Sequence, residues 1–211
     1  MTGILITATG RNINKTIKTE LLAITAINAN VQQKSSELTL LPDVFQTTIF
    51  IDHARDVATA FSTAGTEYRI EVSEKASGND TWRTVSSVVC DITAALSIVT
   101  DAIEASGQTV IECTAVVPIK GDIVFFKHGT IASSEWSKVV SVDASVGTEN
   151  FTIQDALTDT QPQQTMFNKA EQFAITIPTH SFTRLRVIVN NNNGSTNQNI
   201  VSRIAAITTA L

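Results

Sequence analysis

The sequence predicts an all-β protein, namely a β-sandwich that is interrupted by a second, smaller β unit. Threonine, isoleucine and valine account for 72 of the 211 residues, and these β-branched residues favour pleated strands. Short runs of alternating apolar and polar residues recur between clusters of turn-forming residues. We expect three segments: an N-terminal arm at residues 1–35, a discontinuous sandwich at 36–106 and 171–211, and an inserted small β-barrel at 107–170.

The N-terminal arm carries an apolar stripe with helical spacing. Ile13, Ile17, Leu21 and Ile24 follow one another at intervals of four, four and three residues, which places them on one face of a helix. A helix with a single stripe must bury that stripe, either across the sandwich of its own chain or on a neighbouring subunit. Because so many arm positions are β-branched, an extended arm is the other possibility.

The sandwich segments show alternation with a period of two. Side chains of one face recur at every second residue, and Pro, Gly, Asn and Asp mark the turns between the runs. Strands are expected at residues 37–41 and 46–52, on either side of a turn within 66–89, and at 173–177, 185–189 and 200–207.

The inserted segment has short strands and glycine turns of its own. Gly121, Gly129 and Gly147 separate apolar runs, and short strands at this spacing suit a small, strongly bent barrel. Its strands are expected at residues 110–117, 122–127, 136–143 and 150–154.

The charge content narrows the choice of partners. Charged residues make up 17% of the chain, below the roughly 25% usual for soluble domains. Such a surface suits subunit contacts, since charge is depleted at interface cores, although a neutral surface without a partner fits equally well. The net charge of −5 and the lack of a Lys/Arg cluster argue against nucleic acid and anionic membranes as partners.

The sequence shows no targeting or membrane-spanning segment. No apolar stretch approaches the roughly 18 residues that a bilayer requires, and the N-terminus has neither a basic region nor a long apolar run. We therefore expect a protein that is made in a cytoplasm and stays or assembles there.

No catalytic, cofactor-binding or metal-binding signature is present. Cys90 and Cys113 lie in apolar strand contexts and are expected as buried free thiols, with a disulfide between them as the alternative. The best enzymatic pairing would be His128 with Glu135 in the insert, and nothing in their spacing requires it. We expect a protein that is not an enzyme and binds no cofactor.

Two tryptophans allow a second functional interpretation. Aromatic rings on an exposed sheet can stack on sugars, so Trp82 or Trp136 would serve a carbohydrate-binding or adhesion module. Both lie at alternating strand positions, where large aromatic residues are mostly buried. Core packing is the stronger interpretation, and carbohydrate binding remains the alternative.

The strand pattern of residues 37–90 and 172–207 resembles fibronectin type III and immunoglobulin-like sandwiches. The Trp82 hairpin and the corner at 179–182 carry this likeness, with Phe182 near the place where those families have a tyrosine. The arm, the insert with its run 120–127 and the Thr- and Asn-rich composition also resemble virion structural proteins of tailed bacteriophages, such as capsid decoration, neck and tail components.

That resemblance implies a virion structural protein that is assembled in the host cytoplasm. It would bind a repeated capsid, neck or tail surface, other virion proteins and copies of itself, as a homo-oligomer or a lattice-bound subunit. Several modest contacts on a repeated surface would then act together through avidity. The candidate contact residues are Ile13, Ile17, Leu21 and Ile24 in the arm and Phe125, Phe126 and Ile131 in the insert.

Overall fold

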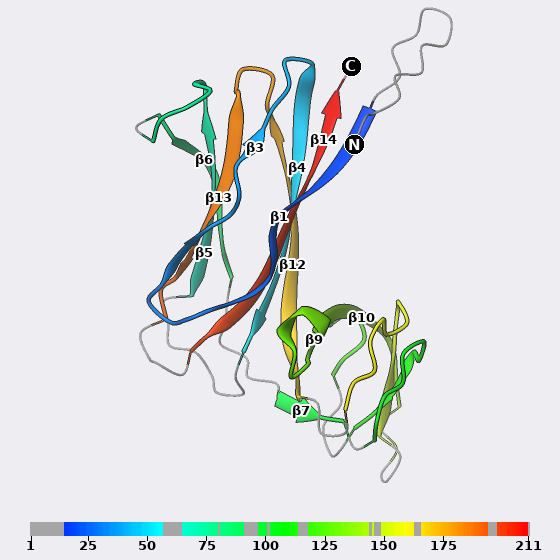
Figure 1. Ribbon diagram of the computed structural model, residues 1–211. Helices are drawn as coiled ribbons and strands as arrows, with labels where there is room; N and C mark the ends of the chain where they lie inside the picture. Colours follow the sequence, from blue (N-terminus) through cyan, green and yellow to red (C-terminus); the bar gives the residue numbers. More distant parts are fainter. Residues whose placement is uncertain are drawn as a thin grey trace, which may run out of the picture.

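The computed structural model describes residues 15–56, 65–79, 81–90, 97–100, 102–113, 118–143, 145, 149–162, 166–193 and 198–210, and the structural statements below concern these residues. Their regular structure consists of β-strands and one short 3₁₀ helix, η1 (Ile131–Ser133). None of the described residues form a helix that is long and apolar enough to cross a membrane. The prediction of an all-β protein is confirmed. Figure 1 shows a long sandwich with a smaller β unit at one end.

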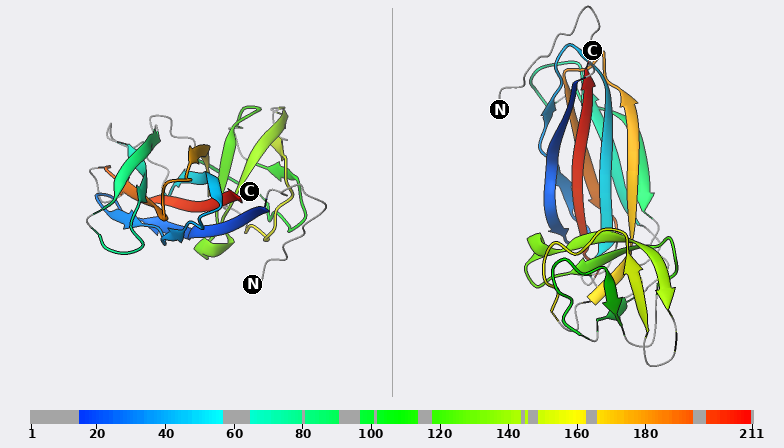
Figure 2. Two further views of the ribbon diagram at one scale, coloured as in Figure 1. Left: turned by 90° about the horizontal axis from the view of Figure 1, so that it is seen from above. Right: turned by 90° about the vertical axis from the view of Figure 1, so that its right-hand side faces the viewer.

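Two antiparallel sheets make the sandwich. The larger sheet contains β1 (Lys15–Ile27), β14 (Ile200–Ala210), β4 (Val44–Arg55) and β12 (Met166–Pro178), in that order. Figure 2 shows these four strands side by side in its right-hand view.

The smaller sheet faces the inner side of the larger one. It contains β13 (Arg184–Asn191), β5 (Thr66–Ser73) and β6 (Arg83–Cys90), and the free side of β13 pairs with two short strands, β2 (Gln32–Lys34) and β3 (Leu38–Thr39). Because β2 and β3 pair with the same strand, they act as one interrupted strand.

The pairing scheme is that of a jelly roll. In the sandwich, the first strand pairs with the last (β1 with β14) and the second with the second-last (β2 and β3 with β13). The next pairs toward the middle of the chain are β4 with β12 and β5 with β6. Such a folded antiparallel ribbon gives eight strands in two sheets. In immunoglobulin-like sandwiches the last strand lies beside the strand before it, whereas β14 lies in the sheet opposite β13. The predicted immunoglobulin or fibronectin order is therefore wrong, since alternation defines strands and not their partners.

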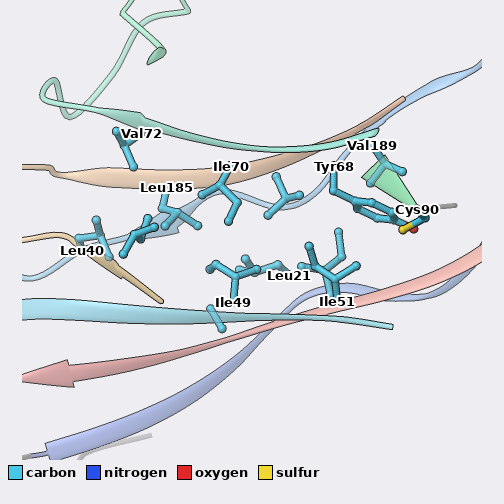
Figure 3. Packing of buried hydrophobic residues seen from close by; sticks show 14 of the residues in the cluster. Leu21, Leu40, Ile49, Ile51, Tyr68, Ile70, Val72, Cys90, Leu185 and Val189 are labelled. Atoms are coloured by element: carbon cyan, nitrogen blue, oxygen red, sulfur yellow. The ribbon is translucent and has the colours of Figure 1, made fainter. Parts of the chain in front are cut away.

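The sandwich core follows the predicted alternation. Tyr68, Ile70 and Val72 of β5 are buried and face Ile49 and Ile51 of β4, as Figure 3 shows. Every second side chain of a strand points to the same face, so β12 in the larger sheet and β13 in the smaller sheet contribute to the same core.

The sequence predicts an arm that is helical or extended, and its described part is extended, so the helical form is wrong there. Residues Lys15–Ile27 form β1, which pairs with β14. Two register shifts, between Glu20 and Leu22 and between Leu22 and Thr25, interrupt the ladder. Each bulge shifts the alternation by one residue, so the predicted stripe does not share one face: Leu21 lies in the core, Ile24 packs on the outer face and Ile17 is exposed.

The insert closes into a small barrel around β12. Its strands are β7 (Ser97–Val99), β8 (Val110–Glu112), β9 (Ile123–Lys127), β10 (Glu135–Asp143) and β11 (Asn150–Ile153). The order runs β12-β9-β10-β11-β8, β7 pairs with β12, and a bridge between residues 100 and 113 joins β7 to β8. The barrel core consists of Ile111, Cys113, Val124, Phe126, Val139, Phe151, Ile153 and Leu157.

One strand connects the two cores. The first residues of β12 pair with β7 and β9 of the insert, and Ala170 to Pro178 pair with β4 of the sandwich. The predicted boundaries at 106/107 and 170/171 stay a prediction. Cys90 lies in the sandwich core and Cys113 in the barrel core, and both are free thiols, as expected.

Candidate interaction surfaces

The insert packs against the outer face of the larger sheet through an apolar cluster, here named the docking cluster. The sandwich contributes Ile24, Ala54, Ala170 and Val201, and the insert contributes Ile123, Phe125, Ile131 and Trp136. The Phe125 side chain is fully buried, and its ring centroid lies 4.5 Å from that of Trp136. Burial of this kind stabilises the contact in proportion to the apolar area removed from water.

Polar contacts fix the orientation of the insert. Lys127 Nζ lies 2.8 Å from Asp56 Oδ1 and donates to the Asp56 main-chain oxygen at 2.8 Å. Trp136 Nε1 donates to the carbonyl of His53 at 3.4 Å, and the Arg203 guanidinium lies 5.4 Å from the centroid of the Trp136 ring. Together with the strand β12, these contacts hold the sandwich and the barrel as one body.

A hollow of about 380 Å³ lies on the outer face of the larger sheet, and we name it the Phe50 hollow. Its lining combines apolar and charged side chains: Lys18, Glu20, Phe50, Asp52, Gln172, Arg203, Ala205 and Ile207. Phe50 is 37% exposed, which is unusual for a large aromatic ring on a sheet.

One wall of the Phe50 hollow is a fixed polar network. Asp52 Oδ2 accepts a hydrogen bond from Arg203 Nε at 2.6 Å and forms an ion pair with Arg203 Nη2 at 2.6 Å. Asp52 Oδ1 accepts a hydrogen bond from Gln172 Nε2 at 2.7 Å. Lys18 and Glu20 of β1 line the hollow as well. The hollow is therefore suited to bind an apolar side chain that has polar neighbours.

Five of the seven predicted contact residues pack within the chain, three of them buried and two partly buried. Leu21 lies in the sandwich core and Phe126 in the barrel core, where its ring stacks on Phe151 at 6.4 Å. Phe125, Ile24 and Ile131 belong to the docking cluster. Their role in binding a partner stays a prediction.

Two predicted arm residues remain. Ile17 is 39% exposed on β1, and Ile13 lies outside the described residues. Sequence reasoning missed the Phe50 hollow, although a signal exists. Phe50 stands between two core residues of one strand, Ile49 and Ile51, so its side chain must point to the other face. An apolar residue at such an outward position marks a candidate contact surface.

Trp82 immediately precedes β6 and packs against two arginines of β13 on the smaller sheet. The guanidinium groups of Arg184 and Arg186 lie 4.7 and 4.1 Å from its ring centroid, a distance at which cation–π attraction contributes. Arg184 also donates to the carbonyls of Lys75 and Gly78 and to Glu37. A hollow of about 400 Å³ beside the indole is lined by Val72, Glu74, Lys75, Thr81, Trp82, Arg83 and Phe182.

The candidate catalytic pair is not assembled. His128 Nδ1 accepts a hydrogen bond from the Thr130 backbone N–H at 2.9 Å, whereas Glu135 accepts hydrogen bonds from the backbone and the hydroxyl of Thr158. Each side chain thus has local structural partners. Among the described residues, no group of three His, Cys, Asp or Glu side chains could hold a metal ion.

One buried polar pair lies between the two sheets. His53 Nδ1 and the Tyr68 hydroxyl are joined by a hydrogen bond of 2.9 Å, and both side chains are buried. Burial, together with the positive charge of Arg55, lowers the pKa of His53 from 6.5 to about 3. The imidazole is therefore neutral at physiological pH and belongs to the core.

Comparisons with known proteins give little. No protein-family model matches the chain, and no curated protein gives a significant match. Among solved structures, the chain is similar to VP17, a capsid protein of bacteriophage P23-77, with 11% sequence identity, a TM-score of 0.21 and coverage of 95% of this chain and 98% of that chain. A likeness at that level carries no argument, so any functional conclusion depends on the strand order and the surfaces described above.

Proposed function

We propose that this chain is a structural subunit of a bacteriophage virion. It binds a repeated capsid, neck or tail surface, and copies of itself, through protein–protein contacts. The observation that carries the proposal is the jelly-roll strand order, an architecture that recurs in viral capsid subunits but also in lectins and cupins. Because one architecture hosts several functions, the surfaces must distinguish between them.

The interior favours a structural role over an enzymatic one. An active site requires convergent titratable groups in an accessible cleft. In the described part of the chain, apolar side chains fill the space between the sheets, and the buried His53 is paired with Tyr68. The Phe50 hollow lies on the outer face of the larger sheet, and the second hollow lies beside the turn between β5 and β6.

The exterior favours a role in assembly. The chain has few charges, which is typical of subunit contacts, and the larger sheet exposes Phe50 in a hollow with a fixed polar wall. The insert is fastened to the same face, so one subunit presents two rigid parts to its neighbours. Several weak contacts of this kind become effective on a repeated lattice.

Co-sedimentation with phage particles tests the proposal. The wild-type protein should pellet with particles, and Phe50→Glu should reduce the bound fraction, because it places a charge among the residues that line the hollow. Leu41→Glu is the matched control, since Leu41 is also an exposed apolar residue (51%) and lies away from the hollow. A wild-type protein that stays in the supernatant at every particle concentration would contradict the proposal.

The hollow beside Trp82 supports the second candidate, a carbohydrate-binding module. Its polar lining and aromatic wall are features that sugars use, although two arginines already lie against the indole. A glycan screen should give no binding that depends on Trp82. A defined glycan whose binding is lost in Trp82→Ala, without particle binding, would replace the virion proposal.

A further inference from the structure

In the described part of the sandwich, four edges lack a partner strand, on β1, on β6, on β2 with β3 and on part of β12, and the first three are blunted. β1 has two bulges and the charges of Lys18 and Glu20. β6 has a register shift and begins with Arg83, and β2 and β3 are short, interrupted and carry Lys34. Bulges, charges and short strands are the ordinary means by which proteins prevent edges from pairing with other chains.

The fourth edge, on β12, has none of these protections. β9 pairs with this edge of β12 from Met166 to Ala170 and ends there, while β4 occupies the opposite edge without a register shift as far as Pro178. Residues 172–177 carry no charge. They leave a straight, uncharged strand edge open next to the insert (Figure 2, right-hand view).

The backbone direction at this edge follows from one hydrogen bond. The Thr179 N–H donates to the Phe45 carbonyl at 2.9 Å, so the odd-numbered residues of this stretch direct their backbone groups toward β4. The even-numbered residues Gln172, Ala174 and Thr176 then direct theirs to the open edge. Pro178 follows the same parity, and proline, which lacks an N–H, is tolerated at an outer edge.

We propose that β12 pairs in antiparallel fashion with β12 of a second copy about a two-fold axis. Ala174 would lie opposite Ala174 of the other copy, and Gln172 opposite Thr176. β9 already pairs with this edge of β12 as far as Ala170, so the strand of the second copy cannot pair beyond that residue. The antiparallel direction places the two inserts at opposite ends of the joined sheet. This pairing deepens the proposed virion role and rests on it.

The side chains make this edge complementary to itself. In a two-fold contact the same surface of both copies meets, so charges of one sign on this edge would repel each other. Residues 172–177 have no charge. The exposed Ala174 leaves room where the two backbones meet at the axis. On the inner face, the partly buried Phe173 and Ile175 would form cross-strand apolar pairs, which stabilise antiparallel sheets.

A cysteine at the axis tests the pairing directly. Hydrogen-bonded residues in antiparallel strands lie about 5.5 Å apart between Cα atoms, a distance that a disulfide spans. Under oxidising conditions, assembled Ala174→Cys protein should form covalent dimers. Thr209→Cys is the control, because Thr209 points to the same outer face from β14, pairs on both edges and does not line the Phe50 hollow. The native cysteines are buried and do not interfere.

A proline at the same position provides an independent test. Ala174→Pro removes an outward N–H and leaves the hydrogen bonds to β4 in place, so the monomer should unfold at nearly the wild-type temperature. Two N–H groups are lost per dimer, which should weaken association about tenfold or more.

The outcomes separate the two proposals. If the chain assembles or binds particles, but Ala174→Cys gives no more dimer than Thr209→Cys and Ala174→Pro associates like wild type, the β12 pairing is overturned and the virion role stands. If the wild-type chain neither self-associates nor binds particles, the virion role itself fails.

Discussion

The two adjacent phenylalanines of β9 offer a prediction that separates the docking of the insert from its internal stability. Phe125 and Phe126 are both fully buried, and they point to opposite faces of one strand. Phe125 belongs to the docking cluster against the larger sheet, whereas Phe126 belongs to the barrel core. Alanine at position 125 therefore removes a phenyl ring from the docking cluster, whereas alanine at position 126 removes the same group from the barrel core.

The magnitude follows from complete burial. Replacing a buried phenylalanine by alanine costs about 3–5 kcal/mol, since the lost transfer free energy adds to that of the cavity left behind. For Phe125→Ala this loss falls mainly on the docked state, so the docking equilibrium should shift by more than about a hundredfold toward an undocked insert. For Phe126→Ala the same loss falls on the barrel itself.

Hydrogen exchange with mass spectrometry distinguishes the two variants. Phe125→Ala should raise exchange in η1 and near Trp136, while the amides between β10 and β11 stay protected. Phe126→Ala should raise exchange in β10 and β11. Equal exchange patterns in both variants, or a loss of less than about 1 kcal/mol in urea unfolding of Phe125→Ala, would refute the separate docking interface.

Three further predictions concern stability. The folded-state pKa of His53 is about 3, below its ordinary value of 6.5, so the unfolded chain binds the proton first and stability should fall by about 2 kcal/mol from pH 7 to pH 5. Urea titrations at both pH values measure this loss. If the His53→Phe variant loses as much stability between pH 7 and pH 5 as the wild type, the prediction is contradicted. Arg203→Ala should cost less than about 1 kcal/mol in thermal unfolding, because the Arg203 side chain is 41% exposed in its pair with Asp52. Gly121→Ala should cost about 1 kcal/mol, since Gly121 has a φ of +97° while no atom lies within 4 Å of the added Cβ, and a stabilised variant would refute this cause.

The sequence predicts strands well where alternation is uninterrupted. The hairpin of β5 and β6, the core faces of β12 and β13 and most of the strands of the insert are visible as period-two patterns, and the structure places Tyr68, Ile70 and Val72 in the core as expected. These elements are specified by local burial on one face. Neighbouring residues are sufficient to reveal them.

Long-range pairing could not be predicted in the same way. β1 pairs with β14, whose residues lie at the other end of the chain, and the bulges of β1 hide its alternation. Nothing near Ile17 or Leu21 shows that the last strand enters the sheet opposite β13 and converts the expected order into a jelly roll. For the same reason, Phe125 and Ile131 resembled partner contacts, although they pack on a sheet formed by distant segments.

The most direct test of the central claim is the mass of the purified chain in solution, measured by light scattering over a concentration series, alone and then with phage particles. An assembly subunit should give discrete oligomers beginning with a dimer, or bind to the particles. A monomer at every concentration that also ignores the particles would contradict the proposed virion role.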